Sequence, residues 1–561
     1  MTADTVSSGR IALQMGVQLV RTAISQPLRA LSKTAQDDGS TSWFAVNEQD
    51  EFESVDERTA QGVEVALVAR SSASPPAAWQ RLLAQLGVKP FLEPQGRTST
   101  GAILFIRVKG RLVAWTFGSG SRWISRRAVD PRFGLLVALN AVAAGGDEGG
   151  GLLAAHLAPT EGGLRDADLR MGSATRGPVA RFDPMSDRLT GVVVETSMDG
   201  LSSVRGARAA SFEASVSSLE DLRKKSADLV ELRASPDYQE AFSYVENVVE
   251  ETDPEVVEAV FTVVWQQSDP SGPSLDVAVA WWDDVREEGD DRVVSHFRMP
   301  GETRRETVPV PQRSRNLVLN WPGVRAALKR RFPEASPVEL MSKELRFYDA
   351  DDEEVGTCEV RDLVVAEPNV GGIGYVVSEG DVFRVAADYL SALDSFLDGL
   401  VVRPSRLSGY TGGHERGYNE STGLALLDRR LVTIDGSRLE PCDLVDDSGR
   451  LIFVKRRAKA SVMSHLWAQI VASGVLLRRS AAARAAFRGQ LSAAGAPSQL
   501  LDAIDSGARS LTLVLSILGV TDIRQLTLLA RIPLRAAVQR LQDLGYTAEI
   551  ELVPNLGAPI P

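Results

Sequence analysis

The chain has 561 residues, 44% of them hydrophobic and 24% charged, which is the composition of a globular protein of about three to four domains. It contains no run of about 20 apolar residues, so no membrane-spanning helix and no membrane partner are expected. The two cysteines, Cys358 and Cys442, lie far apart in the sequence. This argues against a disulfide framework or a thiolate zinc site and favours a cytoplasmic protein.

The net charge of −12 argues against a surface that binds nucleic acid everywhere. The charge is uneven, because residues 401–561 contain 20 Lys and Arg and 14 Asp and Glu, a net +6, so the first 400 residues carry −18. This asymmetry favours DNA or RNA as a partner of the C-terminal part and a protein as a partner of the acidic N-terminal two-thirds. The alternative is a solvated basic surface beside acidic domains.

The order of the predicted elements indicates a multidomain α+β protein. Residues 1–44 are predicted to be an N-terminal extension, in which residues 9–28 form an amphipathic helix or a mobile segment. The remaining parts are a mixed α/β N-terminal domain (45–209), a helical and strand-rich middle region (210–400) and a C-terminal α/β domain with a helical tail (401–561).

The N-terminal domain is predicted to mix strands and helices. Residues 63–69 predict a strand, and residues 75–87, which begin with two prolines, predict a helix. Residues 101–120 form two extended runs about a Lys-Gly turn and predict a hairpin, and residues 132–146 predict a helix that ends in glycines. The residues from 145 to 209, glycine-rich and then polar, are predicted to be a loop and a connection.

In the middle region, apolar residues spaced by three and four predict helices up to about Gln267. Strands are predicted at 274–285 and 292–299, followed by a hairpin with an acidic tip at 344–367, and then by two strands and a helix at 373–400. The C-terminal domain is predicted to run helix, strands, helix, further helices and a late strand.

Two charged residues end neighbouring predicted strands of the C-terminal domain. In LIFVK (451–455), alternation places Lys455 on the same face as Phe453, and the upstream segment LEPCDLVDD places Asp443 on the adjacent strand. This pair suits a metal-dependent phosphodiesterase, in which Asp443, together with Glu440 or Glu415, holds Mg²⁺. Lys455 then positions water and stabilises charge on the phosphate.

The helix that follows carries a polar stripe, because Ser461, His465 and Gln469 are spaced by four residues. His465 and Gln469 therefore join Asp443 and Lys455 in the predicted catalytic set. Simpler explanations stay open: Asp443 as a turn residue, Lys455 on a solvated basic edge strand, and His465 as a half-buried helical histidine.

A helix glutamate, a strand aspartate, a strand lysine and a helix glutamine resemble the restriction-endonuclease-like nucleases, with their Glu, Asp, (Asp/Glu)-x-Lys and Gln elements. The resemblance implies a C-terminal α/β core of that type. The chain departs from the pattern at Phe453, which occupies the acidic position and cannot ligate a metal. Either Glu440 or Glu415 substitutes, or the site is inactive.

A second resemblance covers residues 43–553. It rests on the ordered motifs TGAILFIRVKGRLVAWTFGSGSRWI, DPRFGLLVALNAV, SPDYQEAFSYVENV, GYVVSEGDVFRVAADYLSAL, ERGYNE, LALLDRRLVTIDGSRLEPCDLVDDSGRLIFVKRRAKASVMSHLWAQ and AAFRGQL. The chain resembles a family of sporadically distributed bacterial proteins of unknown function, and this implies cargo of a defence system or a mobile element.

The family's most distinctive block falls on Tyr418, Asn419, Glu440, Cys442, Asp443, Lys455, Ser461, Ser464, His465 and Gln469. The family usually has a histidine where this chain has Phe453. A histidine can ligate a metal and a phenylalanine cannot, so the resemblance leaves the activity of this member open.

Three hypotheses follow. The first is a metal-dependent nuclease with a degenerate site and Mg²⁺ as its cofactor. The second is a non-catalytic nucleic-acid-binding or sensing protein, and the third is a protein-interaction scaffold. The residues predicted to bind nucleic acid are Arg456, Arg457, Lys459, Arg478 and Arg479.

Overall fold

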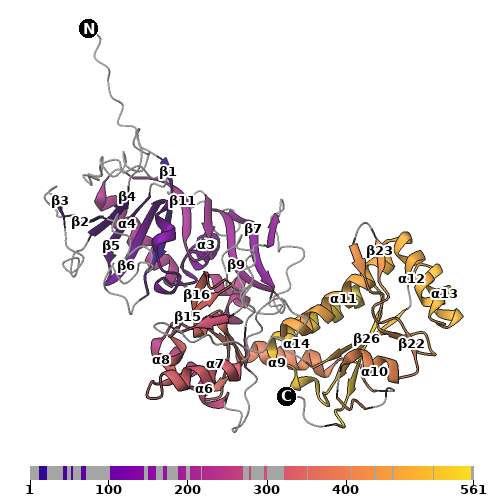
Figure 1. Cartoon of the computed structure of the whole chain (residues 1–561). Coiled ribbons are helices and arrows are strands. Elements are labelled where there is room, and N and C mark those ends of the chain that lie inside the picture. The colour runs from indigo at the N-terminus through magenta and orange to yellow at the C-terminus, as the bar shows by residue number, and fades with distance from the viewer. Residues whose placement is uncertain are drawn as a thin grey trace.

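The computed structural model describes residues 12–21, 42–46, 52–54, 65–70, 101–144, 150–159, 169–172, 187–196, 203–216, 218–268, 277–279, 296–299, 321–349, 351–405, 407, 409–412, 414–434, 437–457, 460–508 and 511–557. These residues form a multidomain α+β protein. An N-terminal sheet, a middle region and a C-terminal sheet follow one another along the chain, and Figure 1 shows the C-terminal lobe set apart from the N-terminal sheet.

The N-terminal sheet has eleven described strands in the order β3-β2-β4-β5-β6-β1-β11-β10-β9-β7-β8. The strands are β1 (Ala12–Leu19), β2 (Ser42–Val46), β3 (Phe52–Ser54), β4 (Val65–Arg70), β5 (Gly101–Val108), β6 (Arg111–Gly118), β7 (Gly150–Pro159), β8 (Leu169–Gly172), β9 (Asp187–Thr196), β10 (Ser203–Gly206) and β11 (Ala210–Ser215). The predicted β5–β6 hairpin is confirmed. Lys109 and Gly110 have φ values of 49° and 73°, as a two-residue turn of this twist requires.

Two predictions in this region are wrong. The segment predicted as an amphipathic helix or mobile extension contains β1, which lies between β6 and β11. Its alternate residues Met15, Val17 and Leu19 are buried, which is the period of a strand. The residues from 145 to 209, predicted to be a loop and a connection, contain β7, β8, β9 and β10. The helix predicted at 75–87 lies outside the described residues.

Helix α3 (Phe133–Ala144) confirms the helix predicted there and packs against the N-terminal sheet beside α4 (Leu219–Ala234). It is apolar on all sides because it is covered on all sides. Its one buried amide, Asn140, donates to the backbone oxygens of Leu232 and Ser235 and accepts from the Tyr238 N–H. The short elements next to it are η2 (Ser119–Trp123) and η3 (Arg126–Ala128).

The middle region has its own small sheets and core. Its elements are α5 (Tyr238–Phe242), η5 (Ser243–Glu246), β12 (Val248–Glu250), α6 (Pro254–Gln267), β13 (Ala278–Val279), β14 (His296–Arg298), α7 (Trp321–Arg331), α8 (Pro337–Met341), β15 (Glu344–Tyr348), β16 (Glu354–Glu359), η7 (Val360–Leu363), β17 (Val364–Val365), β18 (Asn369–Val370), β19 (Ile373–Ser378), β20 (Asp381–Val385) and α9 (Ala387–Asp398). The predicted hairpin with the acidic tip is confirmed as β15–β16, and the predicted two strands and helix are confirmed as β19, β20 and α9.

The C-terminal sheet has the order β21-β28-β27-β26-β25-β22. Strands β26, β27, β28 and β21 are parallel to one another. Strand β25 pairs antiparallel with β26 on one side and with β22 on the other. Its elements are β21 (Val402–Pro404), α10 (Glu415–Ser421), β22 (Ala425–Leu426), β25 (Leu444–Val445), β26 (Leu451–Arg456), α11 (Ala460–Arg479), α12 (Ala481–Ala493), α13 (Ser498–Asp505), β27 (Thr512–Leu518), η8 (Ile523–Gln525), α14 (Leu528–Asp543) and β28 (Thr547–Val553), with the separate hairpin β23 (Val432–Ile434) and β24 (Ser437–Leu439). Strand β27 was not predicted. It is apolar almost throughout because both of its faces are covered.

The two faces of this sheet bury different side chains. Leu451 and Phe453 of β26 belong to the large core that α11 and α14 complete, whereas Ile452 and Val454 face the smaller cluster that includes Tyr418 of α10. The middle region is tied to this core, since the Glu367 carboxylate accepts the first N–H groups of α14. In the part of the chain that is described, every helix is too short or too polar to cross a bilayer.

Candidate functional site

A cavity of about 440 Å³ opens at the end of β26, between α10 and α11. It is strongly charged, with four acidic and four basic side chains in its wall. The lining residues are His414, Glu415, Arg416, Asn419, Asp428, Arg429, Glu440, Asp443, Val454, Lys455, Arg456 and Gln469. These residues come from segments up to 55 positions apart, so only the folded sheet brings them together.

Lys455 enters the cavity from the strand and Glu415 enters it from the first turn of α10. The Lys455 Nζ lies 3.1 Å from Glu415 Oε2, and Glu415 Oε1 accepts the Arg456 N–H at 3.0 Å. Both side chains are partly exposed, at 27% and 32%. Glu415 therefore fixes the end of β26 against α10 and holds the lysine ammonium at the cavity wall.

Three further carboxylates form an acidic cluster, defined as Asp428, Glu440 and Asp443. One oxygen of each lies within 4.8 Å of the others. Asp428 follows β22 and Asp443 precedes β25, and these two strands are paired. The Asp443 carbonyl accepts the N–H groups of Leu427 and Asp428 at 2.8 and 3.0 Å, so the backbone itself sets the approach of the two carboxylates.

Each carboxylate of the acidic cluster accepts hydrogen bonds from neutral donors, one each for Asp443 and Asp428 and two for Glu440. Asp443 Oδ2 accepts the Val454 N–H at 2.7 Å, and Asp428 Oδ2 accepts Asn419 Nδ2 at 3.2 Å. Glu440 accepts the Arg429 N–H and, at 3.4 Å, Gln469 Nε2 from α11. These donors orient the oxygens but bring no positive charge to them.

The electrostatic consequence is a pair of carboxyl groups that are difficult to ionise. Burial raises the pKa of Asp443 to about 8, with smaller contributions in the same direction from Glu440, Asp428 and Glu415, although the Val454 N–H opposes the shift. Burial likewise raises the pKa of Glu440. The nearest cation to Asp428 is the Arg429 guanidinium, at 3.9 Å on a side chain that is 72% exposed.

Asn419 adds a second indication of a ligand. Its side chain is 2% exposed and lines the cavity, yet its Oδ1 has no hydrogen-bond partner among the described residues. Buried amide oxygens are rarely left unpaired. Carboxylate and amide oxygens are the ligands that Mg²⁺ and Ca²⁺ prefer, so Asp428, Glu440, Asp443 and Asn419 can together hold a hard divalent cation.

The structure brings together five of the six residues predicted for catalysis or metal binding: Glu415, Glu440, Asp443, Lys455 and Gln469. Glu415 differs from its expected place, because it bonds to Lys455 and Arg456 and lies outside the acidic cluster.

The other predicted site residues border the same cavity, lie elsewhere or are described only in part. His465 lies in α11, but its side chain is outside the described part of the chain, as is the whole of Lys459. Of the residues nominated to bind nucleic acid, Arg456 lines the cavity and Arg457 is exposed beside it. Arg478 and Arg479 lie in the last turn of α11, and Arg478 is about 14 Å along the helix axis from Gln469.

The sequence did not nominate Asp428, and it gave Asn419 no ligand role. Asp428 follows the short strand β22 and precedes Arg429, whose φ of 66° shows a tight turn. In the sequence, the local signal is an aspartate directly after the apolar run LALL. Phe453, which occupies the position expected to be acidic, is fully buried in the large core and lies outside the cavity wall. The third carboxylate beside Asp443 and Glu440 is thus Asp428.

No curated protein and no solved structure matches the chain. A family model matches residues 15–554, nearly the whole length, and is described as a family of unknown function (DUF6119). Since the match extends from the N-terminal sheet to the end of the C-terminal sheet, the protein belongs to this uncharacterised family.

Proposed function

We propose that the C-terminal domain is a metal-dependent phosphodiesterase that acts on DNA or RNA. The observation that carries the proposal is the acidic cluster beside an ammonium group in one cavity, with Asn419 Oδ1 unpaired among the described atoms of its wall. Carboxylates gathered without a buried cation are expected to bind one.

In this proposal, Asp428, Glu440 and Asp443 hold Mg²⁺ with Asn419. The cation supplies a Lewis acid for the phosphate and acidifies a bound water. Lys455 orients the attacking water and stabilises negative charge on the phosphate. Gln469 holds Glu440 in place through its hydrogen bond. His465 keeps the catalytic role that the sequence predicts for it.

The substrate is proposed to be nucleic acid because the mouth of the cavity is basic. Arg416, Arg429 and Arg456 line it and are exposed, so they can contact phosphates on either side of the reacting one. Arg457 and Lys459 continue this run in the sequence.

We propose that the domain is of the restriction-endonuclease-like type. In support, the chain places helix α10 with Glu415 first, strand β26 with Lys455 second and helix α11 with Gln469 third, which is the order expected of such a core. A cytoplasmic role in a bacterial defence or mobile-element system fits a nucleic-acid substrate. It also fits two buried free cysteines, Cys358 and Cys442.

The test is cleavage of supercoiled plasmid and of single-stranded RNA by the full chain, with Mg²⁺ or with a chelator. Asp443→Asn and Lys455→Met should each lower the cleavage rate by about a hundredfold or more. The matched control is Arg488→Met, which removes an exposed ion pair with Asp505 elsewhere in the domain. Cleavage by Asp443→Asn at the rate of the unaltered chain would overturn the proposal.

Binding without cleavage is the second candidate, and a specific contact favours it. Lys455 forms an ion pair with Glu415, so its ammonium can act on a reacting phosphate only when that pair opens. While the pair is closed, the exposed arginines can still bind nucleic acid without cleavage. If the chain binds nucleic acid but does not cut it, the affinity should fall steeply with salt, because phosphate contacts release counterions. Arg456→Gln should then reduce the salt dependence by about one counterion.

A further inference from the structure

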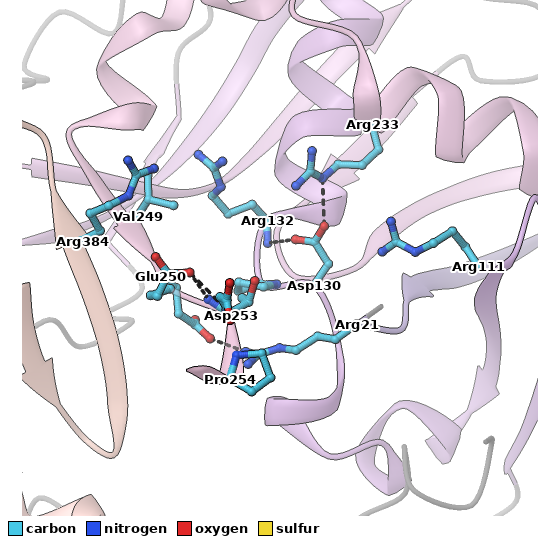
Figure 2. Close-up of a pocket in the computed structure, with 13 residues that line it drawn as sticks. Arg21, Arg111, Asp130, Arg132, Arg233, Val249, Glu250, Asp253, Pro254 and Arg384 are labelled. Atoms are coloured by element: carbon cyan, nitrogen blue, oxygen red, sulfur yellow. Dashed lines mark hydrogen bonds and ion pairs between the residues drawn. The ribbon is translucent and has the colours of Figure 1, made fainter. Parts of the chain in front are cut away.

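A second cavity, of about 500 Å³, lies between the N-terminal sheet and the middle region, far along the chain from the acidic cluster. Figure 2 shows five arginines arranged around it. Arg21, Arg111, Arg132 and Arg233 come from the N-terminal sheet and the helices packed on it, and Arg384 comes from β20 of the middle region.

Three of the arginines are already paired with carboxylates. Arg21 Nη2 lies 2.5 Å from Glu250, Arg233 Nε lies 2.9 Å from Asp130, and Arg132 Nη1 lies 2.7 Å from Glu246. The first two pairs appear as dashed contacts in Figure 2.

The other two acidic residues in the wall are occupied by backbone amides. Glu251 Oε1 accepts the N–H groups of Thr252 and Asp253, and Asp253 Oδ1 accepts the N–H of Glu255 at the start of α6. All four carboxylates that line the cavity therefore have partners within the protein.

Arg111 and Arg384 remain. Neither has an ion pair with any carboxylate in the described part of the chain. The Arg111 Nε is buried and has no hydrogen-bond partner there, and its Nη2 reaches only the Val20 carbonyl, at 3.4 Å. Burial lowers the pKa of Arg111, and the neighbouring Arg233 acts in the same direction, although Asp130 opposes it. Arg111 is partly buried, and a guanidinium whose buried nitrogen has no partner favours an anion.

We propose that this cavity binds a small molecule that carries a phosphate group, with Arg111 and Arg384 as its direct contacts. Asp130 and Glu246 act on Arg111 and Arg384 only at longer range than a direct ion pair. A phosphate monoester carries a charge of about −1.5 to −2 at neutral pH, which matches two guanidinium groups that have no direct ion pair among the described residues, whereas a simple carboxylate matches one. The guanidinium fork also suits the oxygens of phosphate. The volume is that of a ligand of ordinary small-molecule size.

The ligand would join two parts of the chain. Arg111 belongs to the N-terminal sheet and Arg384 to the middle region, so a phosphate bound by both adds a contact across the boundary between them. Binding should therefore stabilise the full chain as well as show a heat of association.

The experiment is isothermal titration of the full chain with inorganic phosphate and with pyrophosphate, at constant ionic strength and in the presence of a chelator. The chelator removes divalent cations, so binding through the acidic cluster does not contribute. We expect saturable binding of one equivalent for both anions, and no saturation by acetate over the same concentration range.

The variants Arg111→Gln and Arg384→Gln should each weaken binding of pyrophosphate about tenfold or more. Arg384 is exposed, so its variant tests the site even if Arg111→Gln fails to fold. Arg488→Gln, at an exposed pair on α12, is the matched control and should bind as the unaltered chain does. Absence of saturable binding, equal binding of acetate, or unchanged affinity in Arg384→Gln would overturn the proposal.

Discussion

Two groups of carboxylates lie on the same C-terminal sheet, and they differ in what balances their charge. The first group is buried, whereas in the second Asp443 is buried and Asp428 and Glu440 are partly buried. In the first, Asp446, Glu549 and Glu551 surround the guanidinium of Arg450, whose nitrogens lie 2.7, 3.1 and 2.9 Å from the three carboxylates. In the second, the hydrogen-bond donors to Asp428, Glu440 and Asp443 among the described residues are neutral, and the exposed Arg429 lies 3.9 Å from Asp428.

The pKa shifts in the two groups have opposite directions. Hydrogen bonds and charge from Arg450 hold the pKa of Asp446 below its usual value despite burial. Arg403 and then Arg450 do the same for the pKa of Glu549. Burial raises the pKa of Asp443 and of Glu440 instead. A buried carboxylate is stabilised as an anion by a nearby cation, and among the described residues a buried cation, Arg450, accompanies the first group and none accompanies the second.

The largest expected effect comes from removing the internal cation. Arg450→Met leaves the buried Asp446 and Glu551 without the cation between them, and leaves Glu549 with Arg403 alone. It should lower the free energy of unfolding by about 3–5 kcal/mol. Urea denaturation of the full chain, followed by tryptophan fluorescence, measures this. Arg488→Met, which removes an exposed pair, should change stability by less than about 1 kcal/mol. Equal effects of the two substitutions would mean that the first group is not held by Arg450.

A smaller effect is expected from adding a cation to the acidic cluster. Mg²⁺ at a free concentration of about 100 times its dissociation constant should stabilise the folded chain by about 2.7 kcal/mol. Asn419→Leu removes the hydrogen bond to Asp428 and the unpaired oxygen, and should weaken Mg²⁺ binding by about tenfold. Thermal unfolding with and without Mg²⁺ provides the comparison. A shift of the same size in Asp443→Asn would place the cation elsewhere.

The smallest effect concerns pH in the presence of a chelator. Because the pKa of Asp443 in the folded state, about 8, exceeds the ordinary 3.8, the folded state binds more protons between about pH 4 and pH 8. The free energy of unfolding should therefore fall as pH rises through this range, and Asp443→Asn should reduce the fall by about 1–3 kcal/mol. Asp446 and Glu549 act oppositely, since their stabilisation is lost only as pH falls below about 4. Identical pH profiles of the variant and the unaltered chain would contradict this assignment.

The sequence by itself determined the elements whose partners are close along the chain. The hairpins β5–β6 and β15–β16 were predicted because each turn joins strands that pair at once, and α3 was predicted because its apolar run ends in glycines. Asp443 and Lys455 line one cavity for the same reason, since β25 and β26 pair across a short turn.

Only the tertiary structure decided features that depend on distant partners. Segment 12–19 has a periodicity compatible with a helix or a strand, and its place between β6 and β11, about 100 and 200 residues away, makes it a strand. The acidic cluster gained Asp428 because β22 pairs with β25, and the second cavity required β6 and β20 to lie opposite each other. A sequence pattern reports the local burial of each residue, whereas a site depends on which buried surfaces face one another after folding.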